Sequence, residues 1–359
     1  MAFTITRAAH AEYRVTDLGR ARAFYVDALG FIEVDSTPDR LYLGGLEERD
    51  KYGLVLRLAP SPGLGHLAFR VTSPSDLDAL AALHAAHGLP HRWVEAGSDE
   101  RGQGRALRVQ DPSGLPIEFF HEIAQRERLL QRFDLYRGAH IMRVDHFNCQ
   151  VPDVQSAYDW WTRRLGFYCS EYTVADRPPP SPSDRDTAGH AHPLPSPAGG
   201  GAGGEGELSD RLWAAWLHRK QNVHDLALMN GIGPRLHHVG LWLQDTASVL
   251  RACDILAALG LGASIERGPG RHGLSNAFFL YLRDPDLNRI ELYTSDYLIP
   301  DPDFAPIRWT LSDPRRATFW GHAPPRSWFD EASLVEDIRT QQLLPVREPL
   351  LAGRPAHVT

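Results

Sequence analysis

The sequence predicts an α+β fold of four modules, each a strand, a helix and then further strands, grouped in pairs into two similar halves. Three observations predict it: one pattern recurs in four segments, the segment lengths alternate along the chain, and strand-like runs follow the helical segments. A chain of 359 residues is long enough for two domains, since one domain usually takes about 100–200 residues. We therefore expect a duplicated pair of domains, with two modules in each.

The first and third segments share a short helix signal. They read VTDLGRARAFYVDALGF (15–31) and VPDVQSAYDWWTRRLGF (151–167). In each, an Asp that can cap a helix is followed 13 positions later by a Gly that can end it. Apolar residues between them recur at intervals of three and four, as on the buried face of a helix.

The second and fourth segments carry a longer version of the same signal. They read VTSPSDLDALAALHAAHGL (71–89) and LQDTASVLRACDILAALGL (243–261). A capping Ser or Asp is separated from the closing Gly by 15 positions in both. Because odd copies match odd copies and even copies match even ones, the unit of duplication is a pair of modules.

Alternating runs after the helices predict the remaining strands of each module. Examples are GLVLRLAP (53–60), ALRVQDPSGLPIEFF (106–120) and AFFLYLRDPDLNRIELY (277–293). The last two contain an Asp-Pro turn between two apolar runs, which is typical of a hairpin. The segment QRERLLQRFDLYRG (125–138) is expected to be a helical connector between the halves.

These signals divide the chain into four parts. We expect residues 1–124 to form an N-terminal domain, 125–142 the connector, 143–298 the C-terminal domain and 299–359 a C-terminal cover and tail. A stretch rich in Pro, Gly and Ser at 176–209 breaks the pattern. It cannot bury enough apolar surface to offset its ordering entropy, so we expect a surface insertion.

The composition limits the classes of function. There are 38 Lys and Arg against 45 Asp and Glu, a net charge of −7, which is not typical of a nucleic-acid-binding protein. The cysteines, Cys149, Cys169 and Cys253, lack CxxC spacing, which favours a reducing compartment. The first ten residues lack an apolar signal-peptide core, and no apolar run is long enough to span a bilayer. We expect a cytoplasmic protein without membrane or nucleic-acid partners.

Histidine and glutamate recur at matching strand positions in the two halves. Each half contributes two His and one Glu: His10, His66 and Glu118 in the first, and His146, His238 and Glu291 in the second. The second His and the Glu are 52 residues apart in the first half and 53 apart in the second. Two imidazoles and one carboxylate from three strands leave coordination positions open, as in non-haem Fe(II) oxygenases, and they also suit Mn(II).

The C-terminal half carries long motifs of a known enzyme family. These are RVDHFN (143–148), WLHRKQNVHDLAL (216–228), the stretch from IERGPGRHG to ELYTSDY (265–297) and DPRRATFWG (313–321). Through them the chain resembles the homoprotocatechuate 2,3-dioxygenases, type I extradiol dioxygenases of the vicinal oxygen chelate superfamily. The resemblance implies the glyoxalase, bleomycin-resistance and extradiol-dioxygenase fold, in which paired βαβββ modules form a cup of sheet around a metal ion.

The resemblance implies that His146, His238 and Glu291 bind Fe(II), with Mn(II) as the alternative. His237 is adjacent to His238, but neighbouring residues on a strand point to opposite faces. Matching HLAFRV of the second module to HVGLWL of the fourth selects His238.

The resemblance also implies roles for four polar side chains. His224 corresponds to the acid/base that takes a proton from the substrate and returns one, which suits an imidazole near neutral pH. Tyr281 corresponds to a hydroxyl donor to the substrate, and Asn148 to a polar contact of the bound oxygen. His272 corresponds to a residue that supports the ligands.

The implied reaction is extradiol cleavage of 3,4-dihydroxyphenylacetate with O2 to 5-carboxymethyl-2-hydroxymuconate semialdehyde. The substrate carboxylate needs a fixed cation, and the resemblance assigns Arg267, Arg315 and Arg316 to it. Trp216 would form part of the pocket wall. A set of C-terminal aromatic side chains would cover the cup: Trp309, Phe319, Trp320, Trp328 and Phe329. The family further implies a homotetramer.

The N-terminal half repeats the ligand set without the acid/base. His10, His66 and Glu118 form a candidate second metal site, whereas Tyr52 and Arg108 occupy the repeat positions of the C-terminal acid/base and hydroxyl donor.

Two alternatives remain open from the sequence. One is an extradiol dioxygenase that acts on a different catechol. The other is a ligand-binding protein of the same superfamily without catalytic activity, which would have no need for the three ligands together with His224 and Tyr281. Oxygen consumption with a catechol distinguishes the second from the first.

Overall fold

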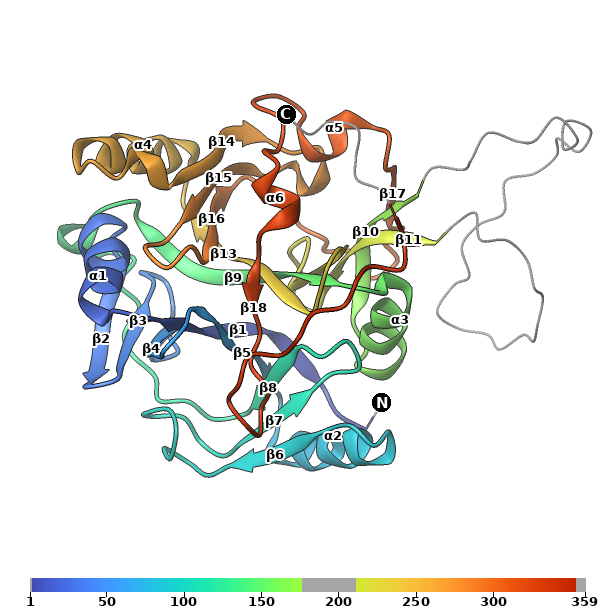
Figure 1. Ribbon diagram of the computed structural model, residues 1–359. Coiled ribbons are helices and arrows are strands. Elements are labelled where there is room, and N and C mark those ends of the chain that lie inside the picture. The colour runs from blue at the N-terminus through green and yellow to red at the C-terminus, as the bar shows by residue number, and fades with distance from the viewer. Residues whose placement is uncertain (1, 176–210, 353–359) are drawn as a thin grey trace, which may run out of the picture.

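The chain folds into two β-sheets that pack against each other, with the longer helices at the periphery (Figure 1). The computed structural model describes residues 2–175 and 211–352. The predicted insertion at 176–209 lies outside the described residues.

The first sheet consists of the first two predicted βαβββ modules. Module one comprises β1 (Ile5–Val15), α1 (Leu18–Arg22), a π-helical turn (Ala23–Ala28), β2 (Ile32–Thr37), β3 (Arg40–Gly44) and β4 (Leu54–Leu58). Module two comprises β5 (Gly63–Val71), α2 (Pro74–Ala86), β6 (His91–Val94), β7 (Ala106–Gln110) and β8 (Pro116–Phe120). The strand order is β2-β3-β4-β1-β5-β8-β7-β6, with β1 and β5 antiparallel at the centre.

The second sheet repeats this arrangement with the other two modules. Module three comprises β9 (Ile141–Val151), α3 (Val154–Asp159), a π-helical turn (Trp160–Arg164), β10 (Tyr168–Val174), β11 (Leu212–His218) and β12 (Leu226–Asn230). Module four comprises β13 (Arg235–Leu243), α4 (Thr246–Ala258), β14 (Ile265–Arg271), β15 (Phe278–Arg283) and β16 (Arg289–Thr294), with 3₁₀ turns at Gly262–Ser264 and Leu274–Asn276. The order is β14-β15-β16-β13-β9-β12-β11-β10-β17, in which β17 (Ile307–Thr310) follows the four modules in the chain. The predicted fold of four modules is confirmed.

Side-chain caps start the four longer helical segments where the sequence predicts them. The carboxylates of Asp17, Asp153 and Asp245 each accept from the backbone N–H three residues on, at 2.9, 3.1 and 2.7 Å. Before α2, the Ser73 N–H donates to the Asp76 carboxylate at 2.9 Å. These bonds satisfy backbone donors that a helix start leaves without partners.

The connector is not the helix that the sequence predicts. Its described helical content is a single 3₁₀ turn, Phe133–Leu135. Its backbone bonds to the first sheet's loops instead: Arg126 N–H donates to the Arg49 carbonyl and Leu129 N–H to the Leu46 carbonyl, both at 2.7 Å. A short helix without a packed face is marginal in water, so these tertiary hydrogen bonds determine the conformation.

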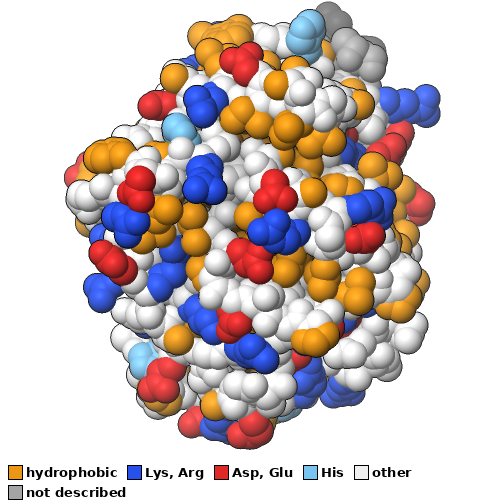
Figure 2. Space-filling view, turned by 90° about the vertical axis from the view of Figure 1, so that its left-hand side faces the viewer, with side chains coloured by type: hydrophobic (Ala, Val, Ile, Leu, Met, Phe, Trp, Pro, Cys, Tyr) orange, Lys and Arg blue, Asp and Glu red, His pale blue; other side chains and the backbone are white. Residues whose placement is uncertain are grey.

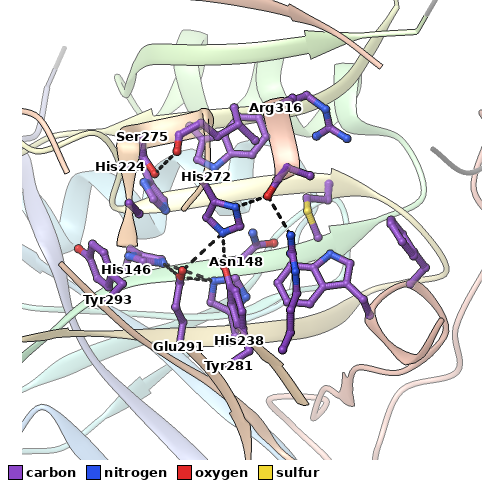
Figure 3. A pocket seen from close by; sticks show the side chains of 18 of the residues that line it. His146, Asn148, His224, His238, His272, Ser275, Tyr281, Glu291, Tyr293 and Arg316 are labelled. Atoms are coloured by element: carbon purple, nitrogen blue, oxygen red, sulfur yellow. Dashed lines mark hydrogen bonds and ion pairs between the residues drawn. The ribbon is translucent and has the colours of Figure 1, made fainter. Parts of the chain in front are cut away.

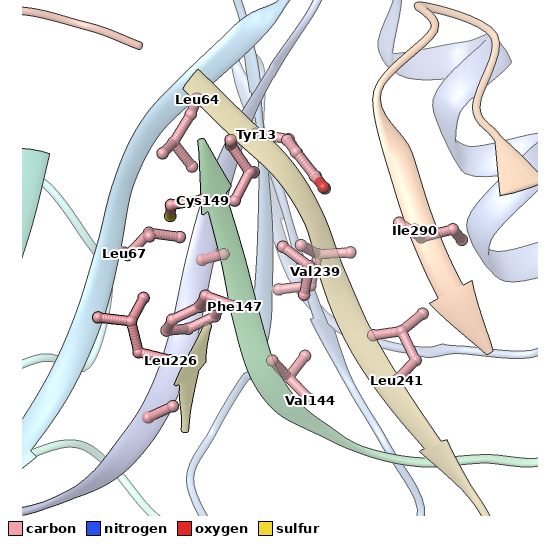
Figure 4. Close-up of a cluster of buried hydrophobic side chains, with 14 of the residues drawn as sticks. Tyr13, Leu64, Leu67, Val144, Phe147, Cys149, Leu226, Val239, Leu241 and Ile290 are labelled. Carbon is pink, nitrogen blue, oxygen red and sulfur yellow. The ribbon is translucent and has the colours of Figure 1, made fainter. Parts of the chain in front are cut away.

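The two sheets share one hydrophobic core between them (Figure 4). Residues from both halves meet in it: Tyr13, Leu64, Leu67, Val144, Phe147, Cys149, Leu226, Val239, Leu241 and Ile290. On β9, alternation places Phe147 and Cys149 in this core and sends His146 and Asn148 to the opposite face of the sheet. Polar side chains of β9 therefore lie on the face away from the core.

The two Asp-Pro turns also hold the halves together. Asp111, in the β7–β8 turn, accepts a hydrogen bond from Trp161 Nε1 in the second half at 3.2 Å. Asp284, in the β15–β16 turn, accepts one from the Tyr25 hydroxyl in the first half at 2.9 Å. Burial raises the pKa of each carboxyl to about 6, although these hydrogen bonds lower it.

We expect Tyr25→Phe to destabilise the fold by about 1.5–3 kcal/mol, the usual contribution of a hydrogen bond to a charged group. Tyr25 is fully buried, and the change removes one donor to Asp284 without changing the ring. Urea unfolding at pH 7 measures the difference. Tyr168→Phe, at an exposed tyrosine, should leave the midpoint unchanged. Equal midpoints for both variants would show that the Tyr25 bond does not contribute to stability.

A C-terminal segment crosses both sheets. It contains β17 (Ile307–Thr310), α5 (Pro314–Ala317), α6 (Ser327–Asp330) and β18 (Ser333–Leu334). β17 pairs with β10, and β18 pairs with β13. Beyond β18, Glu336 forms ion pairs with Arg14 and Arg57 of the first sheet. This part of the chain therefore ties the second sheet to the first.

The surface seen in Figure 2 carries acidic and basic side chains interspersed with one another. This mixture agrees with the small net charge of −7. Among the described residues, no helix has the length and apolar character needed to cross a membrane.

Candidate active site

Three neighbouring strands of the second sheet bring the C-terminal ligand set together. β9 carries His146, β13 carries His238 and β16 carries Glu291, and both His146 and Glu291 pair with Gly240. Gly240 makes room for the imidazole, because a Cβ at this position would lie 2.2 Å from the His146 ring. The three side chains are 1–3% exposed and point toward one another (Figure 3).

The distances within this set fit a shared metal ion. His146 Nε2 and His238 Nε2 each lie 3.1 Å from Glu291 Oε2, and they are 3.4 Å from each other. Donor atoms about 2.0–2.2 Å from one ion lie roughly 3–3.5 Å apart. Two imidazoles and one carboxylate leave further coordination positions open. The residues therefore fit an Fe(II) or Mn(II) ion.

Neighbouring groups keep the Glu291 carboxylate ionised. Burial by itself raises the pKa of a carboxyl, but hydrogen bonds with His146 and His238 hold that of Glu291 well below its ordinary value. Burial lowers the pKa of His238 to about 4. For His146 burial is outweighed by Asp145 and Glu291, which raise the pKa to about 9. A metal ion at this place competes with that proton, because only a deprotonated imidazole nitrogen can bind it.

His237 orients His238 rather than joining the set. His237 Nε2 lies 2.9 Å from the Trp328 carbonyl oxygen, and its Nδ1 lies 2.7 Å from Nδ1 of His238. Because a carbonyl oxygen only accepts, Nε2 of His237 donates to it and Nδ1 accepts the proton of His238 Nδ1. The unprotonated Nε2 of His238 then faces Glu291, as metal binding requires.

His224 lies directly beside the ligands, just before β12. Its ring centroid is 4.0 Å from that of His146, and its buried Nδ1 has no hydrogen-bond partner among the described residues. Burial, together with the charge of His146, holds the pKa of His224 well below its ordinary value. The adjacent Asp225 fixes this loop by accepting from the backbone N–H of Arg219 at 2.6 Å and of Ala8 at 2.7 Å. The neutral ring is therefore held in place beside the ligands.

Tyr281 and His272 form a hydrogen-bonded pair next to Glu291. His272 Nδ1 contacts the Ala317 carbonyl, which only accepts, so Nδ1 carries the proton and Nε2 accepts from the Tyr281 hydroxyl at 2.9 Å. Burial lowers the pKa of His272 to about 3 and raises that of Tyr281 well above its ordinary value. His272 Nε2 also lies 3.8 Å from Glu291 Oε1. Both side chains are therefore neutral and fixed at the edge of the ligand set.

Two arginines give the cavity a positive wall. Arg267 on β14 and Arg316 on α5 both line it. Arg267 Nη2 donates to the Ala317 carbonyl and the Thr318 hydroxyl, at 2.8 Å each, but its buried Nε and Nη1 have no partner among the described residues. The guanidinium packs over the Trp328 ring at 4.5 Å. Burial lowers the pKa of Arg267 to about 10, so it stays charged near neutral pH.

Arg315 is not part of this wall, which corrects the expectation for one of the three arginines. Its exposed guanidinium binds the Asp313 carboxylate at 2.8 and 3.0 Å. Asp313 also caps α5, and this short helix directs Arg315 outward while Arg316 is buried.

The other walls of the cavity are largely apolar. They are formed by Trp213, Trp216, Met229, Leu274, Ala277, Trp328 and Phe329. Apolar walls around a few convergent polar groups are usual for a small-molecule site. Asn148 also lines the cavity, and its buried Oδ1 has no partner among the described residues.

The predicted aromatic cover divides into two groups. Trp328 and Phe329 line the cavity, and Trp309 packs behind its wall. Phe319 and Trp320 are exposed instead.

Sequence reasoning missed Tyr293 and Asp145. The Tyr293 hydroxyl donates to Asp145, its ring lies 4.8 Å from that of His146, and it lines the cavity. A signal was available, because Tyr293 follows Glu291 by two residues on the same strand face.

The N-terminal set converges as well. His10, His66 and Glu118 are buried, and their ligand atoms lie within 4.8 Å of one another and of those of Glu100, which the sequence did not predict. None of these four side chains lines the cavity described above.

Comparison with known proteins places this fold and site in one superfamily. The model of the Glyoxalase/Bleomycin resistance protein/Dioxygenase superfamily matches residues 7–119 and 143–292. The manganese-dependent 2,3-dihydroxybiphenyl 1,2-dioxygenase of Geobacillus genomosp. 3 is 30% identical, over 89% of this chain and 95% of its own. The metapyrocatechase of Pseudomonas sp. (strain CF600) is 29% identical, over 88% and 94%.

Solved structures are similar over almost the whole chain. The homoprotocatechuate 2,3-dioxygenase of Brevibacterium fuscum, in an anaerobic complex with 3,4-dihydroxyphenylacetate, has a TM-score of 0.84 and 38% identity, covering 96% of this chain and 98% of that one. The enzyme of the same name from Arthrobacter globiformis has a TM-score of 0.83 and 40% identity, with 95% of each chain covered.

The chain therefore belongs to the Glyoxalase/Bleomycin resistance protein/Dioxygenase superfamily. Within it, the chain is a metal-dependent extradiol ring-cleaving dioxygenase that acts on catechols.

Proposed function

We propose that the enzyme cleaves 3,4-dihydroxyphenylacetate with O2 to 5-carboxymethyl-2-hydroxymuconate semialdehyde, with Fe(II) as its metal and Mn(II) as the alternative. The observation that carries this choice of substrate is the buried Arg267, which faces the same cavity as the ligand set. Its Nε and Nη1 have no hydrogen-bond partner among the residues that the structure describes. A buried cation without a counter-charge is costly. A substrate carboxylate at Arg267 supplies that charge, and a plain catechol does not.

The ligand set His146, His238 and Glu291 holds the metal ion in this proposal. When bound, the ion lowers the pKa of the substrate's hydroxyls and brings the catechol and O2 together in its open positions. The apolar and aromatic walls keep bulk water away from this reaction.

His224 is the proposed acid/base. Its neutral ring lies against that of His146 and lines the cavity, so it is within reach of a catechol bound there. It accepts a proton from the substrate and returns one as the ring opens. Tyr281 and Asn148 offer polar contacts to the substrate and oxygen, and His272 fixes the Tyr281 hydroxyl.

Oxygen uptake, with the absorbance of the yellow ring-opened product, tests the proposed substrate. The Fe(II)-loaded protein should turn over 3,4-dihydroxyphenylacetate with a much higher kcat/KM than catechol or 4-methylcatechol. A higher kcat/KM for the uncharged catechols would show that 3,4-dihydroxyphenylacetate is not the preferred substrate. The class of enzyme would stay the same. No oxygen uptake with any of them, including after Mn(II) loading, would favour a ligand-binding protein.

Arg267→Met should lower kcat/KM for 3,4-dihydroxyphenylacetate about 30-fold or more, because removing one partner of a buried charge pair costs about 2–5 kcal/mol. The value for 4-methylcatechol should change far less. Arg315→Met is a matched control, because Arg315 is exposed and lies outside the cavity. This variant should leave kcat/KM unchanged for both substrates. Equal losses on both substrates in Arg267→Met would assign Arg267 to the structure of the pocket instead of to the carboxylate.

We also propose that the protein is a cytoplasmic homotetramer. Each chain would consist of two domains, residues 1–124 and 143–298, with a connector at 125–142 and a cover and tail at 299–359. The first range contains both modules of the first sheet, and the second contains those of the second sheet except for the first two residues of β9. Cys149, Cys169 and Cys253 are free thiols, which is usual in a reducing compartment. Sedimentation equilibrium measures the number of subunits, and a mass of one chain would exclude the tetramer.

A further inference from the structure

The first sheet contains a second cluster of metal-binding side chains, built on the same strand positions as the catalytic set. Glu118 on β8 pairs with Ala68, as Glu291 pairs with Gly240 in the second sheet. His10 on β1 also pairs with Ala68, as His146 pairs with Gly240. His66 completes the set on β5, two residues before Ala68.

A fourth group, Glu100, closes this cluster. It belongs to the loop between β6 and β7, and in the second half the corresponding loop, between β14 and β15, carries His272 at the edge of the cavity. Glu100 Oε2 lies 3.2 Å from His10 Nε2, and its Oε1 lies 3.1 Å from His66 Nε2. Glu118 Oε1 is 3.5 Å from His10 Nε2 and 3.8 Å from His66 Nε2.

These distances, from 3.1 to 3.8 Å, bracket the spacing of ligands around an ion. Four donor atoms placed tetrahedrally at about 2.0–2.2 Å from a zinc ion lie roughly 3.3–3.6 Å apart. The histidines contact Glu100 at ion-pair distances, but the hydrogen-bond geometry is poor: neither ring nitrogen of His10 or His66 has a well-aligned hydrogen-bond partner among the described residues, and neither has Glu100 Oε1. All four side chains are 0–1% exposed, so water does not satisfy them from outside.

Surrounding side chains orient the two carboxylates. The Tyr52 hydroxyl donates to Glu100 Oε2 at 2.7 Å. Gln103 donates to Glu118 Oε1, and Arg108 Nε donates to Glu118 Oε2 at 2.7 Å. Outer partners of this kind fix ligands in metal sites. Arg108 also forms an ion pair with Asp99, so the two carboxylates of the cluster carry two negative charges, which a divalent cation balances.

We propose that His10, His66, Glu100 and Glu118 bind a divalent transition-metal ion, of which Zn²⁺ is the best match, as a closed structural site. Four protein ligands leave no position open for a substrate, which is the usual difference between structural and catalytic zinc sites. Tyr52 and Arg108 stand at the places of the acid/base and hydroxyl donor of the other half, so the site stabilises the first sheet and does not cleave rings.

The test uses full-length protein in which the catalytic metal has been removed by His238→Ala. This variant is loaded with Zn²⁺, desalted and analysed by inductively coupled plasma mass spectrometry, and its Tm is followed as Zn²⁺ is added. We expect one metal ion per chain and a Tm that rises with Zn²⁺, as binding to the folded state requires. Adding Glu100→Gln, which keeps the size of the side chain, should remove the ion and the rise in Tm.

Two further variants complete this experiment. His10→Asn in the same background tests a second ligand and should have the same effect as Glu100→Gln. His84→Gln changes a buried histidine of the first half that lies outside the cluster, and it should leave the ion and the Tm response in place. A His238→Ala protein that holds no metal, or one whose metal survives both Glu100→Gln and His10→Asn, would overturn the proposal and assign the cluster to a buried ion-pair network.

Discussion

His238→Ala should abolish ring cleavage. The change removes one of three ligands from the set in which each histidine nitrogen lies 3.1 Å from Glu291. We expect metal affinity at this site to fall by more than the roughly 10–100-fold that the loss of an outer partner costs. Oxygen uptake with 3,4-dihydroxyphenylacetate at saturating Fe(II) measures the activity, and iron analysis in a Glu100→Gln background measures the occupancy of this site alone.

His237→Gln provides a graded comparison with His238→Ala. His237 does not reach Glu291, but it accepts the Nδ1 proton of His238 and is held by the Trp328 carbonyl. We expect it to weaken iron binding about 10–100-fold and to retain activity at high Fe(II). If His238→Ala kept full activity, or if the two variants were equally inactive at saturating iron, the assignment of His238 as the ligand would be wrong.

The local pattern predicted the scaffold well because the physical signals are local. A capping carboxylate such as Asp17 or Asp245 acts on its own helix, so its effect can be read from four consecutive residues. The repeat predicted the ligand strands and selected His238, which lies with His146 and Glu291. Simple alternation does not hold at this position, because the pairing register shifts between Leu236 and His238 and the His237 ring contacts that of His238.

Features that depend on distant contacts could not be predicted in this way. The connector has helix-forming residues, but its N–H groups bond to Arg49 and Leu46 of another loop. Arg315 and Arg316 are adjacent in sequence, and only the ion pair with Asp313 explains which of them turns outward. Glu100 lies in an irregular loop without repeat register, so nothing in the sequence connected it to His10.

His224→Phe should lower kcat about 10²- to 10⁴-fold, the usual contribution of a positioned acid/base. Phenylalanine preserves a flat ring beside His146, where the two imidazole centroids are 4.0 Å apart, but it can neither accept nor return a proton. His224 belongs to none of the metal-ligand groups, so iron content should remain that of the unmodified enzyme. Single-turnover oxygen uptake with 3,4-dihydroxyphenylacetate measures the loss.

The matched control for His224→Phe is His218→Phe. His218 is also buried in the second sheet, yet its Nδ1 bonds to the Lys220 carbonyl and it does not line the cavity. Its replacement should leave kcat within a few-fold of the unmodified value. If His224→Phe reduced iron content and activity together, His224 would act through the metal ligands. If it left kcat unchanged, the proton would have to move through another group. The neutral Tyr281–His272 pair is the remaining candidate in the described cavity. A loss of kcat at full iron content is the result that the geometry of the site requires.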